Sequence, residues 1–173
     1  NFNIAGFYNN FRNQQIQVNF LDNPTDAITV PPLPGLANVG KSRIWGIETD
    51  TRLHLLESFT IDAAYTYLNT KVRSVTFPSL PPTDPYLISG EIRKGYPLVY
   101  SPKHKLTITG TYKLPVDESV GEVSVGATYT LTSKQLYSYN GLTYAFLATQ
   151  QPGWNHSWLA SRHLLNLNLN WSN

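Results

Sequence analysis

The side chains best suited to chemistry stand in a regular row within the first third of the chain. Ionisable groups occupy every second position there: Glu48, Asp50, Arg52 and His54. Side chains two residues apart in a β-strand point to the same side, so we expect these four groups, and Asp62 in the next segment, to share one face. Such a row could contact another domain or conduct a charged solute. The simplest interpretation is a solvated wall whose charges pair with one another.

Enzymatic chemistry finds no support elsewhere in the chain. Cysteine is absent, which excludes disulfides, thiolate catalysis and cysteine-ligated metals. The histidines His54, His104, His156 and His163 lack metal-site spacing, and no carboxylate or cysteine lies near the last two. No Ser/His/Asp motif, phosphate-binding loop or catalytic carboxylate pair stands out. We therefore expect no enzyme, no bound metal and no cofactor.

The composition also argues against an ordinary soluble enzyme. Of the 173 residues, 13% are aromatic and 14% are charged, whereas charged residues make up about a quarter of a typical soluble domain. Mean hydropathy is slightly negative, and no apolar run is long enough for a membrane helix. This combination of few charges, many aromatic residues and a mean hydropathy near zero is expected where lipid-facing and water-facing residues alternate, because their hydropathies cancel in the average. The net charge of +2 is too small to indicate a nucleic-acid partner.

Alternation of apolar and polar residues recurs along the chain and predicts β-strands. In the clearest case, the row of charges alternates with Trp45, Ile47 and Leu53. The segment 165–171 likewise sets leucines against asparagines. We expect six strands, at about 2–19, 41–56, 59–72, 103–115, 121–133 and 158–172.

The connections between these strands alternate in length. Two are short turns, whereas those at about 21–40, 71–101 and 133–157 are long and rich in Pro, Gly, Asn and Tyr. All long connections therefore emerge on one side. Outer-membrane barrels have short periplasmic turns and long extracellular loops, and structureless loops of this length are uncommon in compact soluble domains. The pattern predicts an all-β fold, a transmembrane antiparallel up-and-down β-barrel, with a soluble β-sandwich binding module as the alternative.

The uncharged face of the strands is expected to meet lipid, because an arginine near the bilayer midplane costs about 2–4 kcal/mol. Aromatics near strand ends, among them Tyr65, Tyr67, Tyr129 and Trp171, fit the interfacial belts of such barrels. On the opposite, lumen-facing row, Gly46 leaves room for a plug or a neighbouring side chain to approach. The predicted lipid-facing set is Trp45, Ile47, Leu53, Leu55, Phe59, Ile61, Ile108, Tyr112, Val123, Val125, Leu167 and Leu169.

Six strands are too few for a closed barrel. The smallest known single-chain barrels have about eight, and an open edge in hydrocarbon leaves backbone groups unpaired. We therefore expect an incomplete arc that further chain completes. The sequence has no starting Met or signal peptide, and the alternation still runs at 171–173, so the true N-terminus is expected upstream.

Several segments resemble the barrel of TonB-dependent outer-membrane receptors. The stretch 38–48, with Asn-Val-Gly and then Trp-Gly-Ile-Glu, resembles a family motif on a descending strand, and 59–69 is similar to the strand that follows. Tyr96-Pro97-Leu98 with Ser101-Pro102-Lys103-His104 resembles the family's transition from loop to strand. The segments 5–10 and 164–173 also match typical barrel strands. The resemblance thus spans nearly the whole chain.

This resemblance implies a barrel of about 22 strands, plugged by an N-terminal domain, in a bacterial outer membrane. It implies import of a scarce nutrient such as a ferric siderophore, energised by the TonB complex through an N-terminal part absent from this sequence. The implied partners are outer-membrane lipid, the rest of the barrel and plug, and a small-molecule cargo such as a ferric chelate. Because this sequence contains no plug or TonB box, a structural barrel or scaffold that transports nothing is the alternative.

Cargo recognition is expected in the long loops and the adjoining lumen. Aromatic side chains with a few cations suit anionic chelates or sugars, through stacking and charge pairing. The alternative interpretation is that these aromatic residues only pack the loops together. The candidates are Tyr86, Arg93, Lys94, Tyr96, Tyr137, Tyr139, Tyr144, Trp154 and His156.

Overall fold

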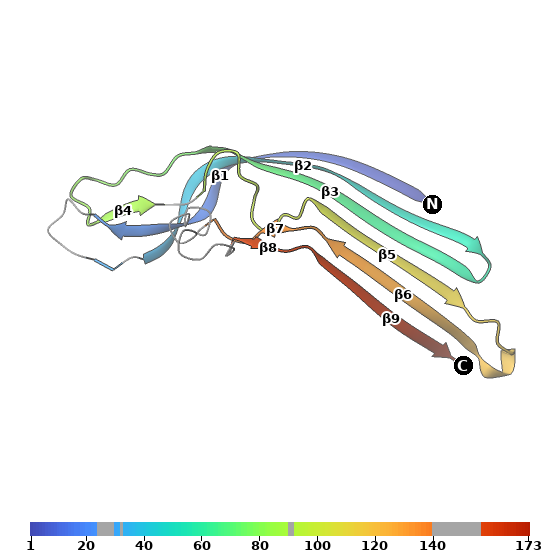
Figure 1. Ribbon diagram of the computed structural model, residues 1–173. Helices are drawn as coiled ribbons and strands as arrows, with labels where there is room; N and C mark the ends of the chain where they lie inside the picture. The colour runs from blue at the N-terminus through green and yellow to red at the C-terminus, as the bar shows by residue number, and fades with distance from the viewer. Residues whose placement is uncertain (24–29, 32, 90–91, 140–156) are drawn as a thin grey trace.

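The computed structural model describes residues 1–23, 30–31, 33–89, 92–139 and 157–173. Its main feature is a seven-stranded antiparallel sheet in the order β4-β1-β2-β3-β5-β6-β9 (Figure 1). The six long strands are β1 (Phe2–Asp22), β2 (Leu33–Leu56), β3 (Phe59–Val75), β5 (His104–Lys113), β6 (Glu122–Thr132) and β9 (Arg162–Ser172). Each of the six expected strand ranges overlaps one of these. The predicted antiparallel all-β arc is confirmed.

Short turns and long connections lie at opposite ends of the sheet. The Glu57–Ser58 turn, the β5–β6 turn with its 3-10 segment η1 (Glu118–Val120) and both chain termini lie at one end, here called the turn end (Figure 1). The other end, here called the loop end, receives the long connections. It also carries three short strands that alternation did not predict: β4 (Tyr86–Ser89), β7 (Gln135–Leu136) and β8 (Trp158–Leu159).

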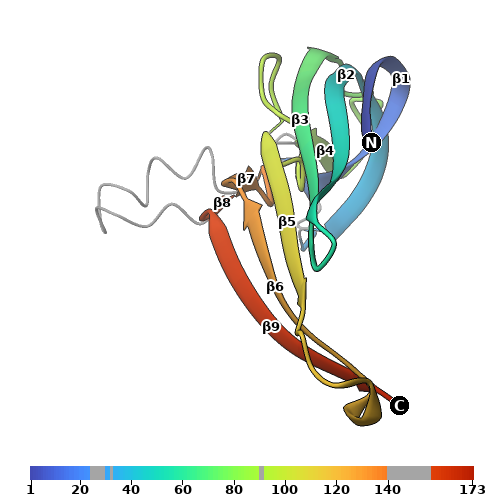
Figure 2. The ribbon, with the colours of Figure 1, turned by 90° about the vertical axis from the view of Figure 1, so that its right-hand side faces the viewer.

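The strands β1, β2 and β3 reach well beyond the others. They contain 21, 24 and 17 residues, whereas β5, β6 and β9 contain 10 or 11. About 9–11 residues suffice for a tilted strand to cross a bilayer. At the loop end, β1–β3 therefore continue beyond the point where β5, β6 and β9 stop. Figure 2 shows this part bending away from the plane of β5, β6 and β9.

The buried core among the described residues lies at this loop end. It consists of Ile16, Val18, Val72, Ile92, Leu98, Leu136 and Tyr139. These residues come from β1, β3 and β7 and from the segments that follow β4 and β7. Backbone hydrogen bonds extend the order of the sheet into these segments, for example from Val72 N–H to the Tyr96 carbonyl (2.8 Å) and from Tyr100 N–H to the Leu136 carbonyl (2.7 Å). The connections therefore fold into a packed cap on the extended strands.

The rest of the sheet buries little. Large apolar side chains on one face remain exposed, including Phe2 (63%), Leu167 (76%) and Leu169 (69%). A soluble sandwich would cover this face with a second layer, and no other described segment does so. The described residues contain no helix that is both long and apolar enough to span a membrane.

Candidate functional site

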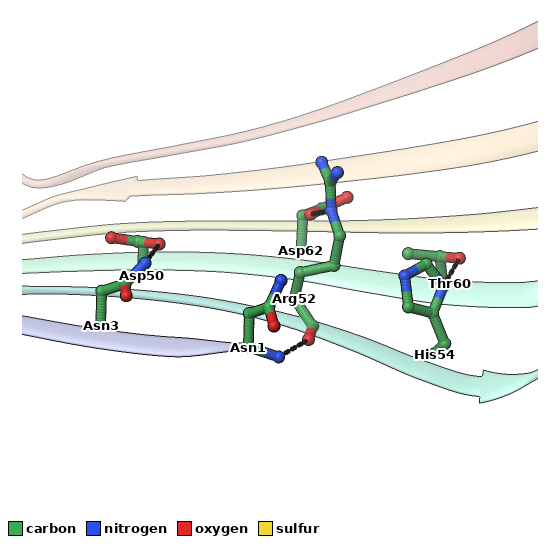
Figure 3. Close-up of polar contacts among 7 residues, drawn as sticks. All are labelled: Asn1, Asn3, Asp50, Arg52, His54, Thr60 and Asp62. Carbon is green, nitrogen blue, oxygen red and sulfur yellow. Dashed lines mark hydrogen bonds and ion pairs between the residues drawn. The ribbon is translucent and has the colours of Figure 1, made fainter.

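The polar face of the sheet carries a ladder of side-chain pairs across β1, β2 and β3 (Figure 3). Asn3 Nδ2 donates to Asp50 Oδ2 (2.8 Å), and Arg52 Nε donates to Asp62 Oδ1 (2.5 Å). His54 Nδ1 lies 3.1 Å from Thr60 Oγ1. Each pair consists of directly opposed residues in the strand register. The sheet thus brings four of the five predicted lumen-facing side chains onto three neighbouring rungs.

The fifth residue, Glu48, lies on the same face and opposes Ala5 on β1 and Thr66 on β3. The polar surface continues across the later strands, where Thr109 Oγ1 lies 3.0 Å from Thr128 Oγ1. Thr128 in turn opposes Asn166 on β9. This face is therefore polar across the whole width of the long strands.

The ion pair in this ladder is exposed. The side chains of Arg52 and Asp62 retain 59% and 39% of their accessible surface, and an exposed pair contributes little to stability because water screens it. Asn3, Asp50, Arg52, Asp62 and Thr109 also line a polar hollow of about 330 Å³. Chemically, the hollow offers carboxylate acceptors and amide and guanidinium donors that remain accessible to a polar surface or to water.

Gly46 explains how β1 packs over the start of this ladder. It opposes Phe7 on β1 and Leu68 on β3. A Cβ placed at Gly46 would approach the Phe7 ring to 2.7 Å and would also collide with the Tyr67 carbonyl oxygen. The close approach expected at this glycine is therefore made by a side chain of the neighbouring strand.

The opposite face has aromatic residues at both ends and aliphatic residues between them. At the loop end the Trp45 and Tyr67 rings are 5.3 Å apart, and Tyr129 Oη lies 2.6 Å from His163 Nδ1. At the turn end, Trp171 Nε1 donates to the Val120 carbonyl (2.7 Å). Alternation and register together put most of the predicted lipid-facing residues on this face: Trp45, Ile47, Leu53, Phe59, Ile61, Ile108, Tyr112, Val123, Val125, Leu167 and Leu169. Leu55, the remaining predicted residue, lies at the register shift between His54 and Leu56.

Three of the predicted cargo-binding aromatics take part in packing at the loop end. Tyr139 is buried, its ring stacks 6.4 Å from that of Tyr96, and its hydroxyl donates to the Pro97 carbonyl (3.1 Å). Burial raises the pKa of Tyr139 to about 12. Tyr86 meets the edge of the Phe20 ring at 6.2 Å. These contacts agree with the alternative interpretation, in which the loop aromatic residues pack the loops together.

The other cargo candidates are placed differently. Tyr137, Arg93 and Lys94 are exposed. Tyr144, Trp154 and His156 lie outside the described residues. The structure therefore brings Tyr96, Tyr137 and Tyr139 to one region, with Tyr86 on the separate edge strand β4.

A cavity of about 380 Å³ lies between β1 and the loop-end cap. Tyr137 and Tyr139 line it together with Tyr100. On the β1 side its wall is formed by the run Gln14–Gln17, which our sequence reasoning did not select. The signal that could have found it is the cluster of amide side chains, which donate and accept hydrogen bonds without carrying charge. Aromatic rings and amides together can hold a polar, partly flat solute.

Comparisons with known proteins agree with this architecture. The family model described as TonB dependent receptor-like, beta-barrel matches residues 1–173. Among solved structures, the chain is similar to the siderophore receptor PiuA from Acinetobacter baumannii, with a TM-score of 0.59 and 21% identity over 98% of this chain. It spans only 20% of that receptor, and at this identity the likeness shows the fold alone. No curated protein sequence matches the chain. The chain therefore belongs to the TonB-dependent receptor β-barrel family of bacterial outer-membrane proteins, and it forms an arc of that barrel.

Proposed function

We propose that this chain is part of the wall of a receptor that imports a scarce nutrient, such as a ferric siderophore, with energy supplied through TonB. The observation that carries the proposal is the division of one sheet into two faces. Leu53 and Ile61 oppose each other on the apolar face, and the next pair, Arg52 and Asp62, opposes on the polar face. In a chain of this family, such a division suits a wall between lipid and a wet lumen.

The polar ladder is the surface that a plug domain would meet. The side chains of Asp50, Arg52 and Asp62 are exposed, so they remain able to exchange their present partners for groups on a plug. Because the Arg52–Asp62 pair contributes little stability by itself, such an exchange would cost little. A lumen wall of this kind lets a plug move while it stays hydrated.

The loop-end cavity is the proposed point of first contact with cargo. Tyr137 offers an exposed ring for stacking, and Gln15 offers an exposed amide. Stacking and neutral hydrogen bonds suit a flat, oxygen-rich chelate or a sugar. Tyr139 lines the same cavity, and its ring stacks against that of Tyr96.

Uptake by the full-length receptor tests the proposal. The receptor would be produced in a bacterial strain that lacks other receptors for the same cargo, and uptake of radioactive iron would be measured for a panel of ferric chelates. We expect uptake of at least one chelate, and we expect it to disappear when TonB is deleted. Tyr137→Ala combined with Gln15→Ala should lower uptake at subsaturating chelate, whereas Leu87→Ala, an exposed residue that does not line the cavity, should leave uptake unchanged.

Two results would count against parts of the proposal. Unchanged uptake by the double variant would remove the cavity from cargo recognition. A correctly assembled receptor without TonB-dependent uptake of any tested chelate or sugar would favour the scaffold alternative.

A further inference from the structure

The loop-end cavity lies along an edge of β1 rather than over one of its faces. Gln15, Ile16 and Gln17 all line it, and their register with β2 is regular. Successive side chains of such a strand point to opposite faces, which agrees with the burial of Ile16 and the exposure of both glutamines. Three residues in a row can therefore line one cavity only from the edge of the strand, where their backbone groups lie.

This edge of β1 is only partly occupied. The other edge pairs with β2, whereas on this one β4 pairs with residues 19–22 (Figure 1). No other segment that the structure describes pairs with β1 here. Backbone N–H and C=O groups of a strand point alternately to its two edges, and unpaired groups at the edge of a sheet can bind a further strand. The edge therefore offers hydrogen-bond donors and acceptors to the cavity.

The free part of the edge at the cavity is short because it is limited at both ends. On the turn-end side, the register of β1 with β2 shifts between Phe11 and Gln15, and Asn13 has a φ of 55°. Such a bulge ends or redirects strand pairing, so a barrel strand that pairs with residues 2–11 cannot continue in the same register. On the other side, the pairing with β4 begins at Asn19. Residues 14–18 span about 16 Å at about 3.3 Å per residue, a length that suits an extended peptide of about five residues.

The cap contributes three tyrosines to the cavity: Tyr100, Tyr137 and Tyr139. The first two are exposed. Tyr100 has a φ of 53°, which is rare for an aromatic residue, and its N–H donates to the Leu136 carbonyl (2.7 Å). Backbone conformations of this kind persist where the surrounding structure holds them, often at ligand-binding positions. Among the described residues that line the cavity, none is charged, which suits a neutral peptide backbone between polar edge groups and aromatic rings.

We propose that residues 14–18 bind an extended peptide segment of the cargo, which joins the sheet as a further strand in line with β4. This inference rests on the proposed function, because it names the class of cargo for the cavity described there. The pairing of β4 shows that the edge accepts an antiparallel strand. Hydrogen bonds between main chains supply affinity in this mode of recognition, and pockets for alternate side chains supply specificity. In this cavity the tyrosines take the second role.

Hydrogen exchange in the ligand-free, full-length receptor in detergent tests whether the edge is open. We expect alternate amides of residues 14–18 to exchange at least about tenfold faster than the amides of residues 44–48, because exchange follows the loss of hydrogen bonding. Residues 44–48 are the matched control, since they belong to β2 and pair with strands on both sides. Equal protection of the two segments would show that another part of the receptor occupies the edge, and it would overturn the proposal.

Binding of synthetic peptides tests the ligand class. The probe is a library of linear hexapeptides with blocked ends, and peptides that stay with the receptor through gel filtration are identified by mass spectrometry. Each is then remade with one or the other set of alternate backbone nitrogens methylated. Methylation of one set should weaken binding about tenfold or more, and methylation of the other set should weaken it much less, because alternate N–H groups of an added strand point to opposite edges. The bound peptide should also slow exchange in residues 14–18.

Two receptor variants complete the experiment. Tyr137→Ala should weaken peptide binding about tenfold, because it removes an aromatic ring from the cavity. Tyr8→Ala, which removes an exposed tyrosine that does not line the cavity, should leave binding unchanged. The absence of any retained peptide, or equal effects of the two methylated sets, would overturn the proposal. Peptide binding in detergent requires neither TonB nor a ferric chelate. A receptor that imports a chelate but binds no peptide would therefore contradict this inference alone, whereas one that binds peptides but imports nothing would contradict import alone.

Discussion

Arg52 on β2 and Asp62 on β3 oppose each other on the polar face, with Arg52 Nε 2.5 Å from Asp62 Oδ1. The next opposed pair, Leu53 and Ile61, points to the other face. Over a single step along both strands, the sheet thus changes from an ion pair to an aliphatic pair. A wall with such a sharp division is suited to two solvents, lipid outside and water inside.

The division of faces predicts opposite outcomes for arginine at neighbouring positions. Ile108→Arg places a charge on the apolar face near mid-strand and should cost about 2–4 kcal/mol there, so assembly of the full-length barrel should fall sharply. Thr107→Arg, on the polar face, should be tolerated. Heat-modifiable migration on gels measures the assembled fraction, and equal assembly of the two variants would contradict the membrane assignment.

Gly46 should tolerate no side chain. Gly46→Ala puts a methyl group against the Phe7 ring and the Tyr67 carbonyl oxygen, and overpacking of this kind costs about 1–3 kcal/mol. Adding Phe7→Ala should restore only part of the loss, because the clash with the carbonyl remains. The matched control is Gly110→Ala, where the new methyl would lie 3.6 Å from the Phe59 ring, an ordinary contact. Denaturant unfolding of the full-length barrel measures the differences, and equal loss at both glycines would contradict this account.

The loop-end cap should loosen in alkali. Burial raises the pKa of Tyr139 to about 12, above the value of about 10 in an unfolded chain. A raised pKa means that the neutral hydroxyl stabilises the cap fully below pH about 10 and that this contribution is lost as the pH rises through 12. Protease sensitivity of the cap should increase over that range in the wild type and less in Tyr139→Phe. An identical pH profile for the two proteins would show that Tyr139 does not titrate in this way.

The turn between β5 and β6 should respond to acid. Hydrogen bonds from the Ser119 hydroxyl and then from the Ser119 backbone N–H lower the pKa of Asp117; the Oδ1 acceptor lies 2.6 Å from the hydroxyl oxygen and 2.9 Å from the amide nitrogen. A lowered pKa means that the turn is stabilised above the ordinary value of about 3.9 and loses this contribution as the pH falls through the lower, folded-state value. The NMR shift of the Ser119 amide should titrate with a midpoint below 3.9. Asp117→Asn should abolish the titration, and a midpoint at or above 3.9 would contradict the prediction.

Alternation along the chain was enough to predict strands and to sort residues by face. Glu48, Asp50, Arg52 and His54 share one face, and Ile47 and Leu53 share the other. Successive side chains of a strand point to opposite faces whatever its partner strands are. The alternation of short and long connections likewise predicted that the loops gather at one end. The alternation of residues and the lengths of the connections are both properties of neighbouring residues, so they can be read from a single sequence.

Only the tertiary structure decided which residues meet across strands. Asp50 pairs with Asn3, and Arg52 pairs with Asp62, although the four ionisable side chains of this row on β2 could have paired among themselves. Phe7 packs over Gly46, and Arg43 stands beside Lys71, because the register joins segments tens of residues apart. The burial of Tyr139 also depends on the extra length of β1 and β3 and on the cap that folds onto them. Such pairings depend on the register in which distant strands meet. The periodicity within a single strand does not specify that register.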